Sequence, residues 1–245
     1  IQEMQVSLGR LINVMSIEEE KYGKKVIKHI QTIEVNNLDF VLDKRVILKN
    51  FSYKFRRGNI YGITGENGAG KSTLMNIITG MYWIPEAPIF INGVPIVKCD
   101  LGKMRRTSYG ILEQEPILLE ESIKDNMFLG GEDKSGSQKF IDITKLLGLD
   151  VFLKKLPNGL ETIINENAMN LSGGEKQKLS LLRILLKDSE VLILDEPASA
   201  LDTDSREQLY NYLNTIKRNS IIFIVTHDDK ITDKVDHIIN LSKNA

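Results

Sequence analysis

Apolar residues in this chain fall into two patterns, nearly unbroken runs and stripes with helical spacing. The runs cover residues 60–64, 109–112, 191–194, 221–225 and 237–241. Strands that are buried on both faces show such runs, whereas half-exposed strands alternate apolar and polar residues. The stripes consist of Leu74, Ile77, Ile78 and Met81, and of Leu209, Leu213 and Ile216. Alternating strands and helices predict an α/β fold, with a mainly parallel sheet and helices on both of its faces.

Two further segments differ from this alternation. Residues from about 116 to 187 are mostly helical in pattern and predict a helical subdomain. Residues 1–25 predict an amphipathic helix and a charged linker ahead of a domain that covers 26–245. This N-terminal helix either leads in from a neighbouring domain or packs on its own domain. Because the chain begins at Ile1 rather than Met, we expect it to be a piece of a longer polypeptide.

Composition narrows the class of protein. Lys and Arg number 32 and Asp and Glu number 33, and the resulting net charge of −1 argues against a nucleic-acid partner. Cys99 is the only cysteine, which excludes an intrachain disulfide and a cysteine-based zinc site. No apolar run approaches the ~20 residues of a membrane helix. A globular domain is therefore expected.

A glycine-rich loop lies between the first apolar run and the first helical stripe. Its glycines allow a tight turn that presents backbone N–H groups to an anion, and the positive end of the next helix points at the same place. In this P-loop pattern, Lys71 reaches the β- and γ-phosphates and the Ser72 hydroxyl holds Mg²⁺. The residues expected to bind the nucleotide are Gly65, Glu66, Asn67, Gly68, Ala69, Gly70, Lys71, Ser72 and Thr73.

Two acidic residues end the apolar run at 191–194. Ligands of open α/β sheets bind at the carboxyl ends of strands, so Asp195 and Glu196 are expected to face the phosphate loop. Asp195 suits Mg²⁺, coordinated through water because Mg²⁺ dehydrates reluctantly. Glu196 is placed to orient or deprotonate an attacking water.

A second candidate anion-binding helix begins within residues 171–177. Ser172 can cap this helix, and the N-terminus of the helix can accept an anionic oxygen. Taken alone, the segment is more typical of a plain Ser-Gly-Gly turn before an ordinary helix. The position of this segment among the other motifs instead favours a functional anion-binding helix start.

In that order, the motifs resemble those of the ATP-binding cassette (ABC) ATPases, the nucleotide-binding domains of ABC transporters. The matches run from the Walker A loop at 65–72 through the Q-loop residue Gln114, the signature motif at 171–177 and Walker B at 191–196 to the D-loop at 199–202 and the switch histidine His227. Glu175 stands where the signature motif usually has glutamine. The resemblance covers the chain from about Ile33 to the C-terminus. It implies a P-loop NTPase (RecA-like) fold, with an antiparallel β subdomain and a helical subdomain beside the parallel sheet.

The resemblance also implies a mechanism in which two copies pair head-to-tail around ATP and Mg²⁺. The signature residues Ser172, Gly173 and Gly174 would contact the γ-phosphate bound to the partner copy, and Asp202 would belong to the nucleotide-binding set. Gln114 would sense Mg²⁺ and the water, and His227 would clamp the γ-phosphate. The implied catalytic residues are Glu196, His227, Lys71 and Gln114, and the implied metal-binding residues are Ser72, Gln114 and Asp195.

Segments near residues 114–126 and 156–162 resemble the exporter branch of the family. This branch implies transmembrane domains as partners and a location at the cytoplasmic face of the membrane. Peptide or bacteriocin cargo is the first expectation, with lipid or drug cargo next. The alternative is a soluble ABC ATPase that acts as a nucleotide-gated dimerisation module and is not linked to transport.

One departure from the family concerns the adenine. Exporters usually stack the base on an aromatic residue near the first strands, but Leu42 stands at that place and Phe40 lies two residues away. Base stacking contributes ~1–3 kcal/mol in nucleic-acid complexes. The affinity for adenine is therefore expected to differ from that of relatives that carry an aromatic residue at this position.

Overall fold

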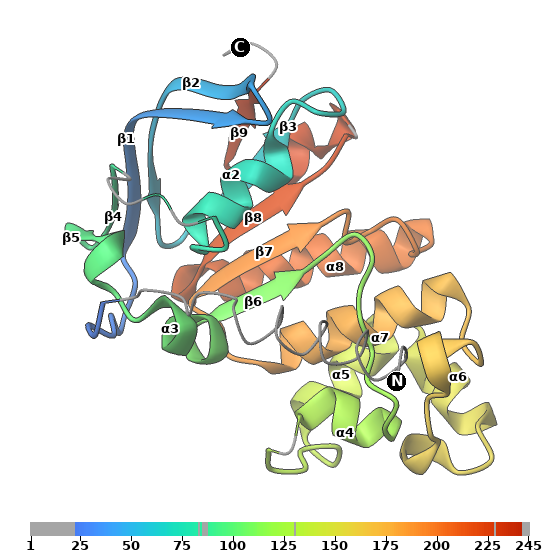
Figure 1. The fold of residues 1–245 in the computed structure, drawn as a ribbon. Coiled ribbons are helices and arrows are strands. Elements are labelled where there is room, and N and C mark those ends of the chain that lie inside the picture. Colours follow the sequence, from blue (N-terminus) through green and yellow to red (C-terminus); the bar gives the residue numbers. More distant parts are fainter. Residues whose placement is uncertain (1–22, 83, 85–87, 130, 228, 242–245) are drawn as a thin grey trace, which may run out of the picture.

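The structure is a computed structural model that describes residues 23–82, 84, 88–129, 131–227 and 229–241. The helix predicted within residues 1–25 lies almost wholly outside the described residues. In the described part of the chain, two sheets and a group of helices make up the fold (Figure 1).

The larger sheet has five parallel strands in the order β6-β7-β8-β3-β9. These strands are β3 (Ile60–Thr64), β6 (Tyr109–Leu112), β7 (Val191–Asp195), β8 (Ile221–Val225) and β9 (His237–Asn240). They coincide with the five apolar runs to within one residue. Val225 of β8 pairs with Asp195 of β7 on one side and with Ile63 of β3 on the other. The carboxyl ends of β7, β8 and β3 therefore lie at the same level of the sheet.

Alternate residues of these strands serve two different cores. Ile193 and Phe223 belong to one cluster, which also contains Leu74 and Ile78 of α2. Leu192, Leu194 and Ile224 belong to the other cluster, which contains the helical part of the chain. Because side chains alternate across a strand, a strand with a core on each side must be apolar at every position.

The smaller sheet is antiparallel, with the order β2-β1-β4-β5. Its strands are β1 (Thr32–Leu42), β2 (Arg45–Arg56), β4 (Ile89–Ile91) and β5 (Val94–Pro95). Asp43 and Lys44 join β1 to β2 in a two-residue turn, with φ of 48° and 65°. Positive φ at both turn residues matches the twist of a hairpin, and this turn brings Leu42 opposite Arg45.

The helices fall into two groups. In Figure 1, α2 (Lys71–Ile78) lies between the two sheets, and α8 (Thr203–Ile216) lies along the other face of the parallel sheet. The helices α4 (Ile123–Phe128), α5 (Gln138–Leu146), α6 (Leu149–Lys155) and α7 (Gly173–Leu186) gather below, within the range predicted for the helical subdomain. A further helix, α3 (Leu101–Thr107), contacts β6. Among the described residues, none of the helices combines the length and the hydropathy needed to cross a bilayer.

The predicted fold class is confirmed, with two adjustments of detail. One face of the parallel sheet is covered by α2 together with the antiparallel sheet, rather than by helices alone. The predicted helical stripe ran to Met81, but α2 ends at Ile78 and the Met81 side chain is exposed. The reason is Gly80, whose left-handed φ of 72° turns the chain away from the helix axis.

Candidate functional site

The loop from Gly65 to Gly70 connects the end of β3 to the start of α2. Gly65, Gly68 and Gly70 all have positive φ, which curls the backbone into a ring. Lys71 reaches back across this ring, and its Nζ donates to the carbonyl oxygens of Gly65 at 2.7 Å and Glu66 at 3.0 Å. The ammonium group thus sits inside the loop, at the positive end of α2.

Strand β2 of the antiparallel sheet touches this loop directly. A Cβ at Gly70 would lie 2.7 Å from Cγ2 of Ile47, which is closer than two carbon atoms can approach. Gly70 is therefore required both by its φ of 90° and by the lack of space. Ile47 in turn fixes the distance between the hairpin and the loop.

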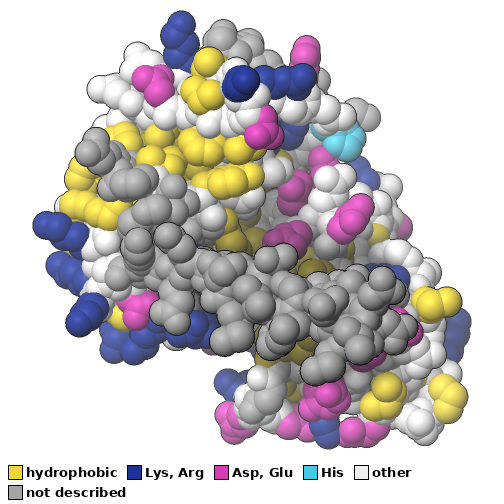
Figure 2. Space-filling model, viewed as in Figure 1, with side chains coloured by type: hydrophobic (Ala, Val, Ile, Leu, Met, Phe, Trp, Pro, Cys, Tyr) yellow, Lys and Arg dark blue, Asp and Glu magenta, His cyan; other side chains and the backbone are white. Residues whose placement is uncertain are grey.

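An open pocket of about 740 Å³ lies between the loop and the hairpin. Most of the sequence-predicted site residues line it: Asn67, Gly68, Gly70, Lys71, Ser72, Thr73, Gln114, Asp195, Glu196 and His227. Gly65, Glu66 and Ala69 belong to the same loop but do not line the pocket. In Figure 2, acidic side chains gather in a hollow beside a broad hydrophobic area of this face. The dimensions and the donor groups suit a nucleoside triphosphate.

Ser72 and Asp195 provide oxygen atoms for a cation. Ser72 Oγ donates to Asp195 Oδ2 across 3.4 Å, which is long for a hydrogen bond between oxygen atoms. Burial and the charge of Glu196 raise the pKa of the Asp195 carboxyl above its ordinary value, although Ser72 and Lys71 oppose this rise. A buried carboxylate that lacks a full counter-charge, next to a hydroxyl and the Gln114 amide in one pocket, fits the oxygen-ligand preference of Mg²⁺.

Glu196 is held from several sides. Its carboxylate accepts hydrogen bonds from Thr226 Oγ1 at 3.1 Å and from the backbone N–H of His227 at 2.9 Å. The His227 ring Nδ1 lies 2.6 Å from Glu196 Oε1. The family resemblance implies that His227 contacts the γ-phosphate, whereas in this structure its ring contacts the carboxylate that would act on the water. The two residues form one unit at the edge of the pocket.

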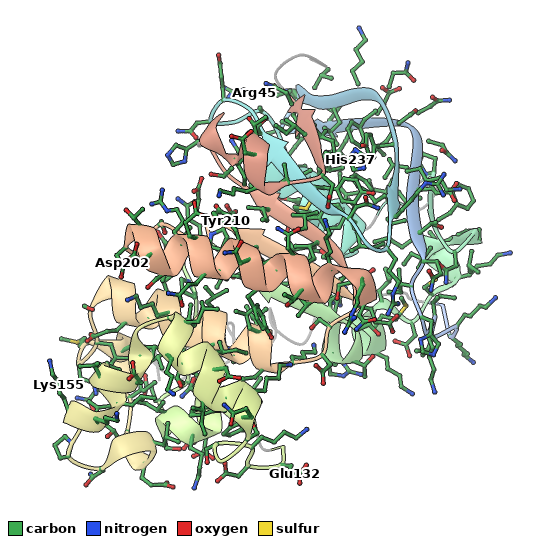
Figure 3. All side chains as sticks on the ribbon, turned by 180° about the vertical axis from the view of Figure 1, so that it is seen from behind. Arg45, Glu132, Lys155, Asp202, Tyr210 and His237 are labelled. Carbon is green, nitrogen blue, oxygen red and sulfur yellow. The ribbon has the colours of Figure 1, made fainter. Side chains whose placement is uncertain are left out.

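The signature residues lie elsewhere. Ser172, Gly173 and Gly174 begin α7 and do not line the pocket. The Ser172 backbone N–H donates to Glu175 Oε2 at 2.7 Å, and Ser172 Oγ accepts from the Glu175 N–H at 3.3 Å, so the two residues form a capping box. Asp202 caps α8 by accepting from the Ser205 N–H at 2.8 Å and also lies outside the pocket. Figure 3 labels Asp202 at that helix end, well apart from Arg45 on the hairpin.

Several residues of the site were missed by sequence reasoning. Asp43, Arg45 and Ile47 line the pocket because the hairpin folds over it. The only sequence signal for the folded-over hairpin would be its two-residue turn. Such turns are usually marked by a glycine, and neither Asp43 nor Lys44 is a glycine. Thr226, which binds the carboxylate of Glu196, and Gln177, the last residue of the signature motif, had no role of their own in the sequence prediction.

The structure also clarifies the base end of the pocket. Leu42 lines it as expected, whereas the ring of Phe40 packs against Tyr82 with 5.5 Å between ring centroids. Among the described lining residues there is no Phe, Tyr or Trp. A base at this end would meet the side chains of Leu42, Arg45 and Ile47.

Replacing Leu42 with tyrosine tests this assignment. An aromatic ring at the base end adds a stacking partner worth about 1 kcal/mol, so Leu42→Tyr is expected to tighten ATP binding roughly fivefold. Isothermal titration calorimetry with ATP measures the change, and Leu42→Met, which stays aliphatic, is the control. An unchanged dissociation constant in Leu42→Tyr would mean that the base does not contact residue 42.

The raised pKa of Asp195 leads to a prediction about stability. Burial disfavours the ionised carboxylate in the folded chain, so the wild type loses stability as pH rises through the raised pKa. Without nucleotide, Asp195→Asn is expected to melt at a higher temperature than the wild type near neutral pH. This difference should shrink as pH falls and the wild-type carboxyl is protonated. With Mg²⁺ and nucleotide the order should reverse, because only the wild type gains stability from the bound ion; calorimetry in both conditions checks this.

Comparison with known proteins places these features in context. The family described as "ABC transporter" matches residues 48–199. Curated relatives include an ATP-dependent lipid A-core flippase of Mannheimia succiniciproducens, 34% identical over 233 residues that cover 94% of this chain and 40% of the relative. The flippase of the same name from Escherichia coli K12 is 30% identical, with the same coverage of 94% and 40%. An export ATP-binding/permease protein of Rickettsia typhi is 32% identical over 95% of this chain and 41% of the relative.

Solved structures give the same fold. A bacterial Atm1-family ABC exporter with ATP bound superposes with a TM-score of 0.82 at 24% identity, over 99% of this chain and 44% of that chain. This chain therefore spans about 40% of the length of the curated relatives that it matches.

Proposed function

This chain belongs to the ABC transporter family, and we propose that it binds and hydrolyses ATP to drive export across a membrane. The observation that carries the proposal is the single pocket that joins the phosphate loop, Asp195, Glu196 and the β1–β2 hairpin. The six ordered motifs and the names of the relatives, which are ATP-dependent flippases and an export permease, support it.

Binding of the nucleotide follows from charge and geometry. The triphosphate meets the N–H groups of the curled loop and the Lys71 ammonium, which is already fixed at the loop's centre. Ser72, Asp195 and Gln114 would hold Mg²⁺, which when bound withdraws charge from the β- and γ-phosphates. Leu42, Arg45 and Ile47 then cover the base.

Hydrolysis requires a base for the attacking water. Glu196 has a carboxylate at the pocket edge whose two oxygens are oriented by Thr226 and His227. A water between Glu196 and the γ-phosphate would lose a proton to that carboxylate as its oxygen bonds to the γ-phosphorus. The bond from the γ-phosphorus to the bridging oxygen breaks in the same step, and that oxygen leaves with ADP. The direct contact of 2.6 Å between His227 Nδ1 and Glu196 Oε1 would hold the imidazole beside the carboxylate that takes the proton.

The pocket of this chain is open, which supports a role for a second copy in closing it. Within a single chain, Ser172, Gly173, Gly174 and Asp202 stay away from the chain's own pocket. We propose that two copies pair head-to-tail, so that the start of α7 in each copy covers the γ-phosphate bound to the other. An anion at a helix N-terminus is favoured by the free N–H groups there.

The proposal includes partners and cargo. Transmembrane domains would convert closure of the pair into transport, with this chain at the cytoplasmic face of the membrane. The relatives named lipid A-core flippase favour a lipid as the cargo, and no relative named above supports the peptide or bacteriocin cargo expected first from the sequence. The soluble dimerisation module likewise finds no support among them.

Steady-state hydrolysis by the purified chain tests the proposal. ATP turnover should depend on Mg²⁺ and should rise faster than linearly with protein concentration, because two copies build each active site. Turnover that stays linear down to nanomolar protein would contradict the shared site. Absence of any ATP-dependent phosphate release would contradict the enzymatic function itself.

A further inference from the structure

Gln177 connects α7 to the residue that bears the catalytic carboxylate. Its side-chain Nε2 donates to the backbone carbonyl oxygen of Glu196 at 2.9 Å and to Ser199 Oγ at 2.7 Å. Ser199 Oγ lies 2.9 Å from Gln177 Oε1 and 3.0 Å from the Glu196 carbonyl oxygen. Gln177 Nε2 thus donates both of its hydrogens to residues 196–199, the segment that directly follows β7.

Glu196 needs such support because its backbone is strained. Its φ is 47°, in the left-handed region that costs an L residue other than glycine roughly 1–2 kcal/mol. The Glu196 N–H donates to the Val225 carbonyl at 2.9 Å, which ties the residue to β8. On its other side, the Glu196 carbonyl accepts from Gln177 and Ser199. These bonds set the direction in which the Glu196 side chain leaves the backbone.

The same face of α7 carries the signature residues. Residues three and four apart on a helix are neighbours, so Gln177 lies one turn after Gly173 and Gly174 on that face. A Cβ at Gly174 would lie 3.7 Å from Cβ of Ala200, so this face rests against the segment that contains Ser199 and Ala200. A shift of the start of α7 therefore moves the Gln177 amide relative to Glu196.

We propose that Gln177 is a positioning residue that links two nucleotide sites. When the start of α7 closes on the γ-phosphate of the partner copy, Gln177 carries that movement to Glu196 in its own copy. Each bound ATP then affects the alignment of the base that acts on the other ATP. The inference rests on the proposed function, because it requires the head-to-tail pair.

Two substitutions at residue 177 test the link. Gln177→Ala removes the amide, and Gln177→Glu keeps the shape but replaces the Nε2 donor with an acceptor. Both are expected to lower kcat about tenfold, as for one lost hydrogen bond at the Glu196 carbonyl, which then keeps only its contacts with Ser199. KM for ATP should stay within about twofold, since Gln177 does not touch the nucleotide pocket. The Hill coefficient for ATP should fall to one.

A matched control and a double substitution separate positioning from folding. Gln138→Ala removes an exposed glutamine of α5 that bonds Asp142, and it should leave kcat and the Hill coefficient unchanged. Ser199→Ala removes the second side-chain donor to the Glu196 carbonyl, while the Ser199 backbone N–H still donates to it at 3.2 Å. In the double variant Gln177→Ala/Ser199→Ala, the loss in kcat should be smaller than the product of the single losses, because both act through one carbonyl.

The outcomes distinguish the inference from the proposed function. If the wild type hydrolyses ATP with a Hill coefficient above one and Gln177→Ala keeps both properties, the link does not exist. If Gln177→Glu matches the wild type, the Nε2 donor is not what matters and the inference is wrong. If the wild type itself releases no phosphate from ATP, the proposed function fails instead, and thermal melting of all variants reports whether they remain folded.

Discussion

Replacing Glu196 with glutamine should stop most ATP turnover while leaving ATP binding intact. The amide keeps the size of the side chain but cannot take a proton from water, and general base catalysis contributes ~10²–10⁴-fold. We therefore expect kcat to fall at least ~100-fold. The Kd for ATP should change little, because Lys71 and the loop backbone hold the phosphates.

The same variant should accumulate as an ATP-bound pair. If hydrolysis is what reopens the pair, a copy that binds but does not hydrolyse remains closed. Light scattering after size-exclusion chromatography, with and without MgATP, measures this. Glu120→Gln, at an exposed position, is the matched control and should behave like the wild type. Wild-type turnover in Glu196→Gln would remove Glu196 from the catalytic role.

Replacing Lys71 with alanine should weaken ATP binding more than any other single change. Hydrogen bonds to charged groups contribute roughly 1.5–3 kcal/mol, which corresponds to a loss of about 10–100-fold in affinity. The Gly65 and Glu66 carbonyls also lose their donor, so the loop is less well fixed for the phosphates. Calorimetric titration with ATP measures the effect. Lys155→Ala, on the helical subdomain (Figure 3), removes a lysine far from the pocket and should leave the Kd unchanged; equal affinity in both variants would place Lys71 outside the site.

The parts of the fold that were predicted correctly share a physical cause. Strand β8 and residues 191–194 of β7 are apolar throughout because each strand has a core on both sides, and this pattern is local in the sequence. The phosphate loop was found for a similar reason, since its glycines are needed by the loop's own backbone. Membership of the ABC transporter family, inferred from the order of such motifs, is confirmed.

The parts that were not predicted depend on packing between distant segments. Arg45 lines the pocket because the hairpin folds back over the loop, and nothing near Arg45 in sequence signals this. The pairing of His227 with Glu196 and the reach of Gln177 from α7 likewise join residues from different elements. Met81 fits a helical stripe by spacing, yet the backbone of Gly80 ends the helix before it.

The contact between Ile47 and Gly70 has a consequence for which molecules fit. Because Ile47 at the base end already packs against Gly70 of the phosphate loop, these two parts of the pocket cannot move closer together without a clash. A compound whose ring and terminal phosphate stand closer together than the base end and the phosphate loop would therefore contact only one of them. The length of a ligand, as well as its charge, therefore decides whether it binds at both ends of the pocket.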